Sequence, residues 1–227
     1  MVDIHSHILF GIDDGAKDLN ESIKLCKQAS KLGYKDILCT SHYIKGKFEN
    51  KKYFQNFKIL RAALKKEKID LNIHLGNEIY LDMDTFCSLE NKKFNTLAQT
   101  NYILVEFPKG LLFKVKYNMI TSLIEKGYRI IIAHIERYPE LSKSEILKIK
   151  ELGVKIQSNI SAIPIILKRN SSFYSENIID ILASDAHNIK HRNYFLEKEF
   201  TFFKIFIGEE KLKNLTDVFP RQILNIR

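Results

Sequence analysis

The chain has 227 residues, of which 45% are hydrophobic and 28% are charged. This composition is typical of a globular protein with a sizeable core, and it excludes intrinsic disorder. No apolar run approaches the ~18–20 residues of a membrane span, and no basic start precedes an apolar stretch, so neither membrane insertion nor a signal peptide is expected. The three scattered cysteines (Cys26, Cys39 and Cys87) do not predict a disulfide framework, and a reducing, cytoplasmic location is expected.

The charge balance indicates anionic partners. The formal net charge is +9, from 36 lysines and arginines against 27 acidic residues. Nucleic acid, membrane headgroups and acidic or phosphorylated protein tails are all attracted to such a surface. Part of the excess is local, because Lys45 to Lys68 holds nine cationic side chains and two glutamates. The simplest interpretation of this run is the solvated face of one helix.

Short apolar strands and amphipathic helices are predicted to alternate along the chain. The predicted strands cover residues 2–5, 37–39, 71–75, 102–107, 130–133, 154–158 and 178–183. The predicted helices cover residues 18–32, 49–66, 116–126 and 144–152, with a helical stretch between the last two strands and a helical tail from about residue 194. Asp18 can cap the first helix and Gly33 can end it. In the second helix the apolar stripe consists of Phe54, Phe57, Leu60 and Leu64.

Seven strands, each followed by helical or loop material, predict an α/β fold with a parallel sheet. No nucleotide-binding fingerprint is present, which favours a closed (β/α) barrel over an open sheet. Residues 1–227 are expected to form a single domain.

Metal-ligating residue types follow the predicted strands at their carboxyl ends. In chain order they are His5, His7, Asp13, Asp14, His42, Glu78, Glu106, His134, Asn159, Asp185 and His187. In a parallel barrel these ends converge on one face, where active sites form. Imidazole and carboxylate ligands suit manganese, iron or zinc, and so many ligands exceed what one ion needs. We therefore expect two or three ions bridged by carboxylates. His74 and His191 are interpreted as satisfied polar residues outside this set.

The same residues carry a family resemblance. Residues 3–17, Asp-Ile-His-Ser-His-Ile-Leu-Phe-Gly-Ile-Asp-Asp-Gly-Ala-Lys, resemble the opening of bacterial PHP-type (polymerase and histidinol phosphatase) protein-tyrosine phosphatases of capsule and exopolysaccharide synthesis. Further matches are Thr-Ser-His at 40–42, Gly-Asn-Glu-Ile at 76–79, Val-Glu-Phe-Pro at 105–108, Ile-Ala-His-Ile-Glu-Arg-Tyr at 132–138 and Ala-Ser-Asp-Ala-His-Asn at 183–188.

The resemblance implies a distorted (β/α)7 barrel of the PHP type with a trinuclear metal site. Manganese is the implied metal, with iron, zinc, cobalt or magnesium as alternatives. The implied metal ligands are His5, His7, Asp14, His42, Glu78, Glu106, His134, Asp185 and His187. Catalytic, phosphate-binding roles are implied for Arg137 and Arg192.

Three segments depart from the family pattern. Residues 157–162 lack an expected Ala-Gly pair, Ile135 replaces a proline, and Tyr43 stands where a second histidine is frequent. These differences concern the pocket wall and the substrate fit more than the metal site.

The residues also favour one chemistry over another. A thiolate phosphatase needs an arginine six residues after its cysteine, and none of the three cysteines has one. Hydroxide formed from water on the metal ions is therefore the expected nucleophile. A tyrosine phenolate, with a pKa near 10, is a fair leaving group and needs little protonation. For a general acid the sequence offers only Asp13 as a candidate.

The expected substrate is a phosphotyrosine-bearing protein, and the resemblance implies the carboxyl-terminal tail of a bacterial tyrosine kinase. Two enzyme alternatives keep the fold and the metals: a phosphatase of a small monoester such as histidinol phosphate, and an enzyme that processes nucleic-acid ends. A third alternative is a basic binding module with a structural metal or none. Nucleic acid is the less favoured partner, and the oligomeric state stays open.

Overall fold

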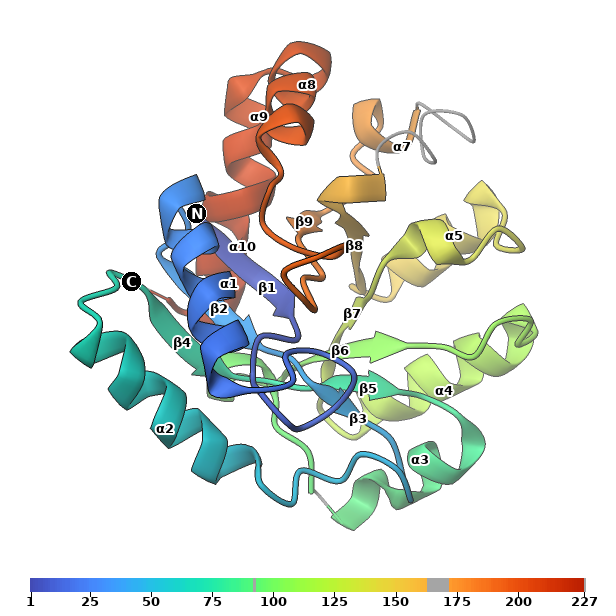
Figure 1. The fold of residues 1–227 in the computed structure, drawn as a ribbon. Helices are drawn as coiled ribbons and strands as arrows, with labels where there is room; N and C mark the ends of the chain where they lie inside the picture. Colours follow the sequence, from blue (N-terminus) through green and yellow to red (C-terminus); the bar gives the residue numbers. More distant parts are fainter. Residues whose placement is uncertain (92, 163–171, 227) are drawn as a thin grey trace.

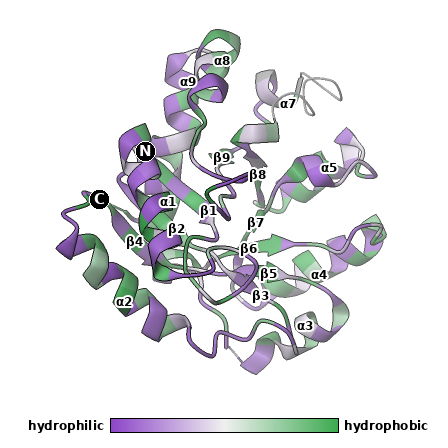
Figure 2. Ribbon diagram, in the orientation of Figure 1, coloured by the Kyte–Doolittle hydropathy of each residue, from purple (hydrophilic) through white to green (hydrophobic). Residues whose placement is uncertain are grey.

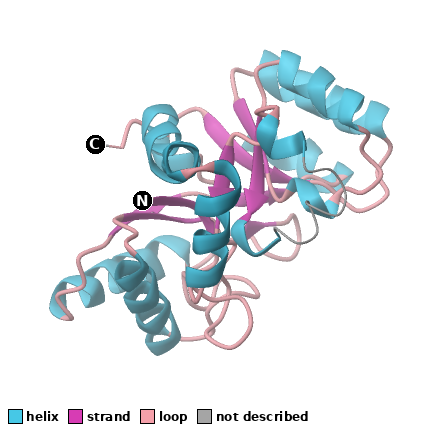
Figure 3. Ribbon diagram, turned by 90° about the horizontal axis from the view of Figure 1, so that it is seen from above, coloured by secondary structure: helices cyan, strands magenta, loops and turns pink. Residues whose placement is uncertain are grey.

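Parallel strands lie at the centre of the computed structural model, with helices around them (Figures 1 and 3). The structure describes residues 1–91, 93–162 and 172–226. The strands are β1 (Val2–Ser6), β2 (Asp36–Cys39), β3 (His42–Tyr43), β4 (Asn72–Leu75), β5 (Glu78–Tyr80), β6 (Tyr102–Glu106), β7 (Arg129–Ile132), β8 (Lys155–Asn159) and β9 (Ile181–Ala183). The helices are α1 (Leu19–Leu32), α2 (Tyr53–Lys66), α3 (Met83–Ser88), α4 (Phe113–Glu125), α5 (Lys143–Glu151), α7 (Ser172–Ser175), α8 (Glu197–Ile207), α9 (Glu209–Lys213) and α10 (Phe219–Leu224).

The strands form a distorted barrel. Hydrogen bonds order them as β1-β2-β4 in one sheet and β3-β5-β6-β7-β8-β9 in another, and neighbouring strands are parallel throughout both sheets. Backbone hydrogen bonds connect the segment that follows β9 to the end of β1. The Asp185 N–H donates to the His5 carbonyl, and the His7 N–H donates to the Ala186 carbonyl, both at 2.8 Å. The predicted α/β barrel class is confirmed.

Two of the predicted strands, 37–39 and 71–75, are each followed after a short break by a further short strand that was not predicted. β2 ends at Cys39 and β3 begins at His42, while β4 ends at Leu75 and β5 begins at Glu78. The break moves the pairing, because β2 pairs with β4 whereas β5 pairs with both β3 and β6. The short pieces β3 and β5 start with His42 and Glu78, so the distortion positions two residues of the predicted site.

Apolar side chains fill the inside of the barrel. The inner cluster contains Val2, Ile4, Leu38, Tyr102, Leu104, Ile131, Ala133, Ile181 and Ala183, with Leu97 and Leu224 added from outside the strands. A larger buried cluster lies between the barrel and its helices. Both faces of the strands are therefore buried, which explains their nearly continuous apolar sequences. The central strands are correspondingly hydrophobic in Figure 2.

The ends of α1 agree with the capping signals in the sequence, whereas the start of α2 does not agree with the prediction. Asp18 caps α1 by accepting the Glu21 N–H at 2.9 Å, and Gly33 ends it with a left-handed φ of 100°, as predicted. α2 begins at Tyr53 rather than at residue 49. Its buried stripe includes Tyr53, whereas Phe54 is 54% exposed, so the expected stripe was wrong at that position. The shift has a local cause, because Ile44 and Phe48 exchange backbone hydrogen bonds in a turn that precedes the helix.

Other predictions concern the chain beyond β8. The helical stretch expected between the last two strands lies mostly outside the described residues. The described part of this segment contains a turn over Ile160–Ala162 and the short helix α7. The helical tail is confirmed by α8, α9 and α10. No helix in the described ranges has the length and apolar character needed to cross a bilayer.

The tail is tied to the barrel through Asp36. This carboxylate, 4% exposed, accepts the Arg221 guanidinium of α10 at 2.8 Å and the His74 imidazole of β4 at 2.9 Å. His74 is thus a satisfied polar residue, as interpreted from the sequence. Burial alone would raise the pKa of Asp36, but the hydrogen bonds from His74 and Arg221 outweigh it and lower the pKa below 3.8.

Replacing Asp36 by Asn is expected to destabilise the fold by about 2–3 kcal/mol at pH 7, because Arg221 loses its buried partner. A lowered folded-state pKa gives stability that is present above the unfolded-state pKa and lost as the pH falls through the folded-state value. The gap between wild type and variant should therefore shrink towards pH 3. Urea unfolding at the two pH values measures it, and a gap that does not change with pH would contradict the ion-pair account.

Candidate metal centre

The nine predicted metal ligands converge at the carboxyl ends of the strands. Within the described part of the chain, four groups of side chains each place their ligand atoms within 4.8 Å of one another. The groups are His7, Asp14, His42 and His187; His5, His134 and Asp185; His5, His7 and Glu78; and His42, Glu78 and Glu106. Every predicted ligand belongs to at least one group. The groups share members, so they form one continuous cluster.

Glu78 lies at the centre of this cluster. Its Oε2 is 3.2 Å from His5 Nε2, 3.1 Å from His7 Nε2 and 3.2 Å from His42 Nδ1. Its Oε1 lies 2.8 Å from His134 Nε2. One carboxylate from β5 therefore faces four imidazoles from three other parts of the barrel. His5 and His7 point to the same side, with their Nε2 atoms 3.3 Å apart, as their spacing predicts.

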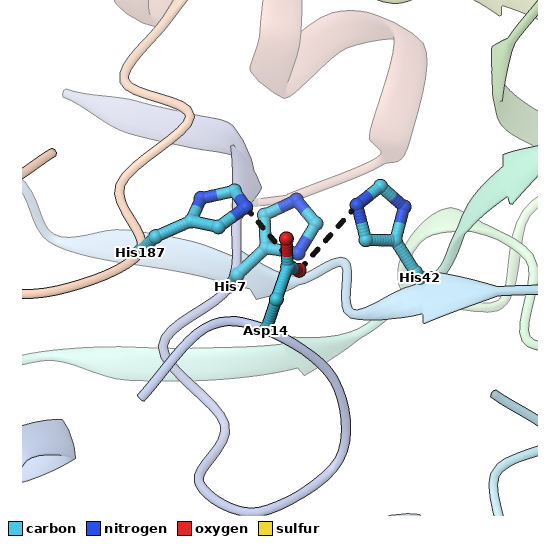
Figure 4. Close-up of side chains that lie close together, drawn as sticks. All are labelled: His7, Asp14, His42 and His187. Carbon is cyan, nitrogen blue, oxygen red and sulfur yellow. Dashed lines mark ion pairs between the residues drawn. The ribbon is translucent and has the colours of Figure 1, made fainter. Parts of the chain in front are cut away.

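A second group lies towards solvent. Figure 4 shows the rings of His42 and His187 facing the Asp14 carboxylate from opposite sides, with His7 behind it. Asp14 Oδ1 is 3.6 Å from His42 Nε2 and 3.7 Å from His187 Nε2. Asp14 is 60% exposed, whereas His7 and His187 are buried. This group therefore forms the open edge of the cluster.

Two arginines line the same cup. Arg137 donates to Asp185 Oδ2 at 2.5 Å, and its other terminal nitrogen is 3.5 Å from Glu106 Oε1. Arg192 pairs with the same Asp185 oxygen. Both guanidiniums are about one-third exposed, so a solvent-borne anion can reach them. The structure brings the two predicted phosphate-binding residues to one buried carboxylate of the cluster.

Comparisons with known proteins show which family this chain belongs to. The sequence profile of the family described as "Capsular polysaccharide synthesis, CpsB/CapC" matches residues 1–225. The chain belongs to the CpsB/CapC family. It is 32% identical over 238 residues to the tyrosine-protein phosphatase CpsB of Streptococcus pneumoniae, covering 99% of this chain and 98% of that protein.

Solved structures of other proteins share the fold of this chain. A structure from the study of "YwqE from Bacillus subtilis and CpsB from Streptococcus pneumoniae, unique metal-dependent tyrosine phosphatases" matches with a TM-score of 0.89 and 29% identity, over 99% of this chain and 94% of that one. The histidinol phosphate phosphatase of Lactococcus lactis, solved with zinc, L-histidinol and phosphate, matches with a TM-score of 0.57 and 13% identity, over 92% and 93% of the two chains. The second likeness concerns the fold alone.

In this CpsB/CapC chain a second layer of polar side chains forms hydrogen bonds to the residues of the cluster and orients them. Asp13 Oδ2 accepts from His7 Nδ1 and from the His42 N–H, both at 2.7 Å, and its Oδ1 accepts the Gly15 N–H. Burial would raise the pKa of Asp13, but the charge of His7 outweighs it and lowers the pKa. Asp13 is thus an ionised acceptor that orients two imidazoles, which is the opposite of what a general acid needs.

Gln157 and Asn159 are two further members of this layer. Gln157 Oε1 accepts the His134 N–H at 2.8 Å and lies 3.1 Å from His5 Nδ1. Asn159 donates to Asp185 Oδ2 at 2.8 Å. Sequence reasoning noted Asn159 at a strand end but gave Gln157 no role. The available signal was that Gln157 and Asn159 occupy alternate positions of one strand and so lie on the same face of it.

Backbone geometry at the strand ends is unusual. His134 and Asp185 have left-handed φ values of 31° and 54°, which are rare outside glycine and cluster at functional sites. Gly15 packs so tightly that a Cβ there would lie 2.2 Å from the His7 carbonyl oxygen. The loop that carries Asp13 and Asp14 therefore needs glycine to approach the end of β1.

The electrostatics of the cluster are dominated by burial and by close charges. Burial raises the pKa of Glu106 to about 7, with a further rise from the charge of Glu78. Burial lowers the pKa of His187 to about 2, helped by the charge of His7. Burial would raise the pKa of Glu78, but the surrounding imidazoles hold it well below its ordinary value. The neighbouring carboxylates of the cluster repel one another when ionised, and cations bound between them would balance their charge.

The donor set fits metal ions. His42 Nδ1, Asp185 Oδ1 and His187 Nε2 are buried atoms of the cluster with no hydrogen-bond partner among the described residues. Buried polar atoms rarely lack hydrogen bonds, so these three atoms are suited to bind a metal ion. The ligands are nitrogen and oxygen atoms with no sulfur. This set suits Mn, Fe or Zn.

Proposed function

We propose that this CpsB/CapC chain is a metal-dependent tyrosine-protein phosphatase that hydrolyses phosphotyrosine in proteins. The observation that carries the proposal is the convergence of nine nitrogen and oxygen ligands with two arginines in one cup. Relatives that match nearly the whole chain are named tyrosine-protein phosphatases, which supports the substrate class.

The proposed metal ligands are the nine predicted residues, and the proposed cofactor is manganese as three ions. Four overlapping ligand groups, which share the Glu78 carboxylate and three histidines, support more than one ion. Ions held by these residues would supply a nucleophile from water at neutral pH and would neutralise the charge of phosphoryl oxygens. Asp13 and Gln157 hold the imidazoles that bind them, as outer-layer partners of metal sites do.

The arginines are the proposed phosphate clamp. Each guanidinium can give two parallel hydrogen bonds to phosphoryl oxygens, and these bonds strengthen as charge develops. In the structure both arginines pair with Asp185, so this carboxylate positions them beside the proposed ions. The thiol at Cys39 is buried and burial raises its pKa well above 9, which opposes a thiolate mechanism.

We further propose a cytoplasmic location and a role in capsular or exopolysaccharide synthesis, with the tail of a bacterial tyrosine kinase as the substrate. The family description supports the pathway. The basic surface supports an acidic, phosphorylated tail.

A substrate panel tests the function against its alternatives. Purified protein loaded with Mn²⁺ is incubated with a phosphotyrosine peptide, histidinol phosphate, a mononucleotide and a 3′-phosphorylated DNA end. We expect phosphate release mainly from the peptide, and loss of release after chelation. Turnover of histidinol phosphate or DNA ends without release from the peptide would reject the proposal. Activity that survives chelation would reject the metal dependence.

Replacing Arg137 by Ala is expected to raise KM for a phosphotyrosine peptide about tenfold or more and to lower kcat, because one arm of the clamp is lost. Metal content should stay at the wild-type level, since Arg137 is not a ligand in the proposal. Steady-state kinetics and elemental analysis measure the two effects. Loss of metal in this variant would contradict the assigned role.

A further inference from the structure

A pocket adjoins the metal cluster on the side of α2. It has a volume of about 230 Å³ and is lined by Gly11, Ile12 and residues 46–52. Gly11 and Ile12 directly precede Asp13 and Asp14. From the other wall, the ring of Phe48 stacks on the ring of His42 with centroids 6.2 Å apart. The pocket therefore lies next to His42, at the open edge of the cluster.

The pocket walls are held in place by hydrogen bonds. Ile44 and Phe48 exchange two backbone bonds of 2.9 Å, which fixes Phe48 in a tight turn. Asn50 has a left-handed φ of 61°, and its amide donates to Asn77 and to the Lys93 carbonyl. Across the pocket, Asn56 donates to the Phe10 carbonyl at 2.7 Å and so links α2 to the Gly11 loop. The shape is thus largely formed before any ligand arrives.

The lysines of the pocket form no ion pair in the described structure, although Lys47 Nζ lies over the Phe48 ring, 4.9 Å from its centroid. Lys47, Lys51 and Lys52 line it, and in the described ranges no carboxylate lies within 4.0 Å of their ammonium groups. Glu49 is the acidic residue of the lining. Its carboxylate accepts the Gly46 N–H at 2.9 Å and pairs with Lys45 at 3.3 Å. Lys51 and Lys52 stand just before α2, where cations oppose the helix dipole, so local helix stability does not explain them.

We infer that this pocket is a subsite for an acidic side chain that flanks the phosphotyrosine of a protein substrate. The inference rests on the proposed function and names part of the substrate that the function leaves open. A carboxylate in the pocket meets unpaired lysines while the phosphate of the neighbouring residue lies over the cluster. Such partly exposed charge pairs add selectivity and faster association rather than large affinity.

Two matched phosphopeptides test the subsite. One has glutamates on both sides of the phosphotyrosine, and the other has glutamines in their place. For the wild type we expect kcat/KM to be about five- to tenfold higher for the acidic peptide, with the ratio falling at high salt. In the double variant Lys47→Gln, Lys51→Gln the ratio should fall to about one.

A control variant separates the pocket from overall charge. Lys58→Gln, Lys65→Gln removes the same charge from exposed positions of α2 outside the pocket, and it should keep the wild-type ratio. Equal kcat/KM for both peptides in the wild type would overturn the subsite and leave the phosphatase function intact. An equal loss of the ratio in the control would also overturn it, since long-range attraction would then suffice. Failure to hydrolyse any phosphotyrosine compound would instead defeat the proposed function.

Discussion

Replacing Glu78 by Gln is expected to lower kcat/KM for phosphotyrosine peptides by about 10³-fold or more. The substitution keeps the shape of the side chain but removes the negative charge that four imidazoles face at 2.8–3.2 Å. In the proposal Glu78 binds more than one ion, so its loss affects several sites together. Changes one layer further out from a metal already cost 10–100-fold, and a shared ligand should cost more.

The measurement combines kinetics with metal content after loading with Mn²⁺. Glu78→Gln should hold less metal than the wild type, while its far-ultraviolet circular dichroism stays unchanged. Glu90→Gln is the matched control, because Glu90 is exposed and pairs only with Lys126 in the described structure. Glu106→Gln should have a smaller effect, since Glu106 lies at the rim. Full metal content and activity in Glu78→Gln would remove the basis of the proposed centre.

The location of the site could be predicted from the sequence because the strand topology alone brings these residues together. His5, His134 and Asp185 are far apart in the chain, but each lies at or just after the end of a segment whose sequence predicts a strand. Once the strands are parallel, their carboxyl ends must share one face. Nothing about side-chain conformation is needed for that step. The histidines outside this pattern, His74 and His191, also fall outside the cluster.

Details that depend on contacts between distant segments were not predictable. The breaks after β2 and β4 follow from how those strands meet their neighbours, and neither break is marked by proline. Gln157 gains its role only because β8 lies beside His134 and His5 in space. Likewise, Asp13 and Asp14 are adjacent in sequence, yet one orients imidazoles from behind and the other faces solvent. Sequence spacing alone does not distinguish the two.

Replacing Asp185 by Asn should be as damaging as the change at Glu78, but for two reasons at once. One oxygen of Asp185 faces His5 and His187, where the proposed ions bind, and the other holds Arg137 and Arg192. Asn removes the charge from both tasks. We expect kcat to fall about 10³-fold and KM for phosphotyrosine peptides to rise as well, because the arginines lose the group that positions them.

The backbone makes this substitution a clean test. Asp185 has a left-handed φ of 54°, and asparagine tolerates that conformation as well as aspartate does. The fold should therefore survive, and thermal unfolding of the metal-free variant checks that it does. Asn159→Ala is the comparison, since it removes only the hydrogen bond to Asp185 and should cost about 10–100-fold. If Asp185→Asn raised KM without lowering kcat, Asp185 would position the arginines only and would not be a metal ligand.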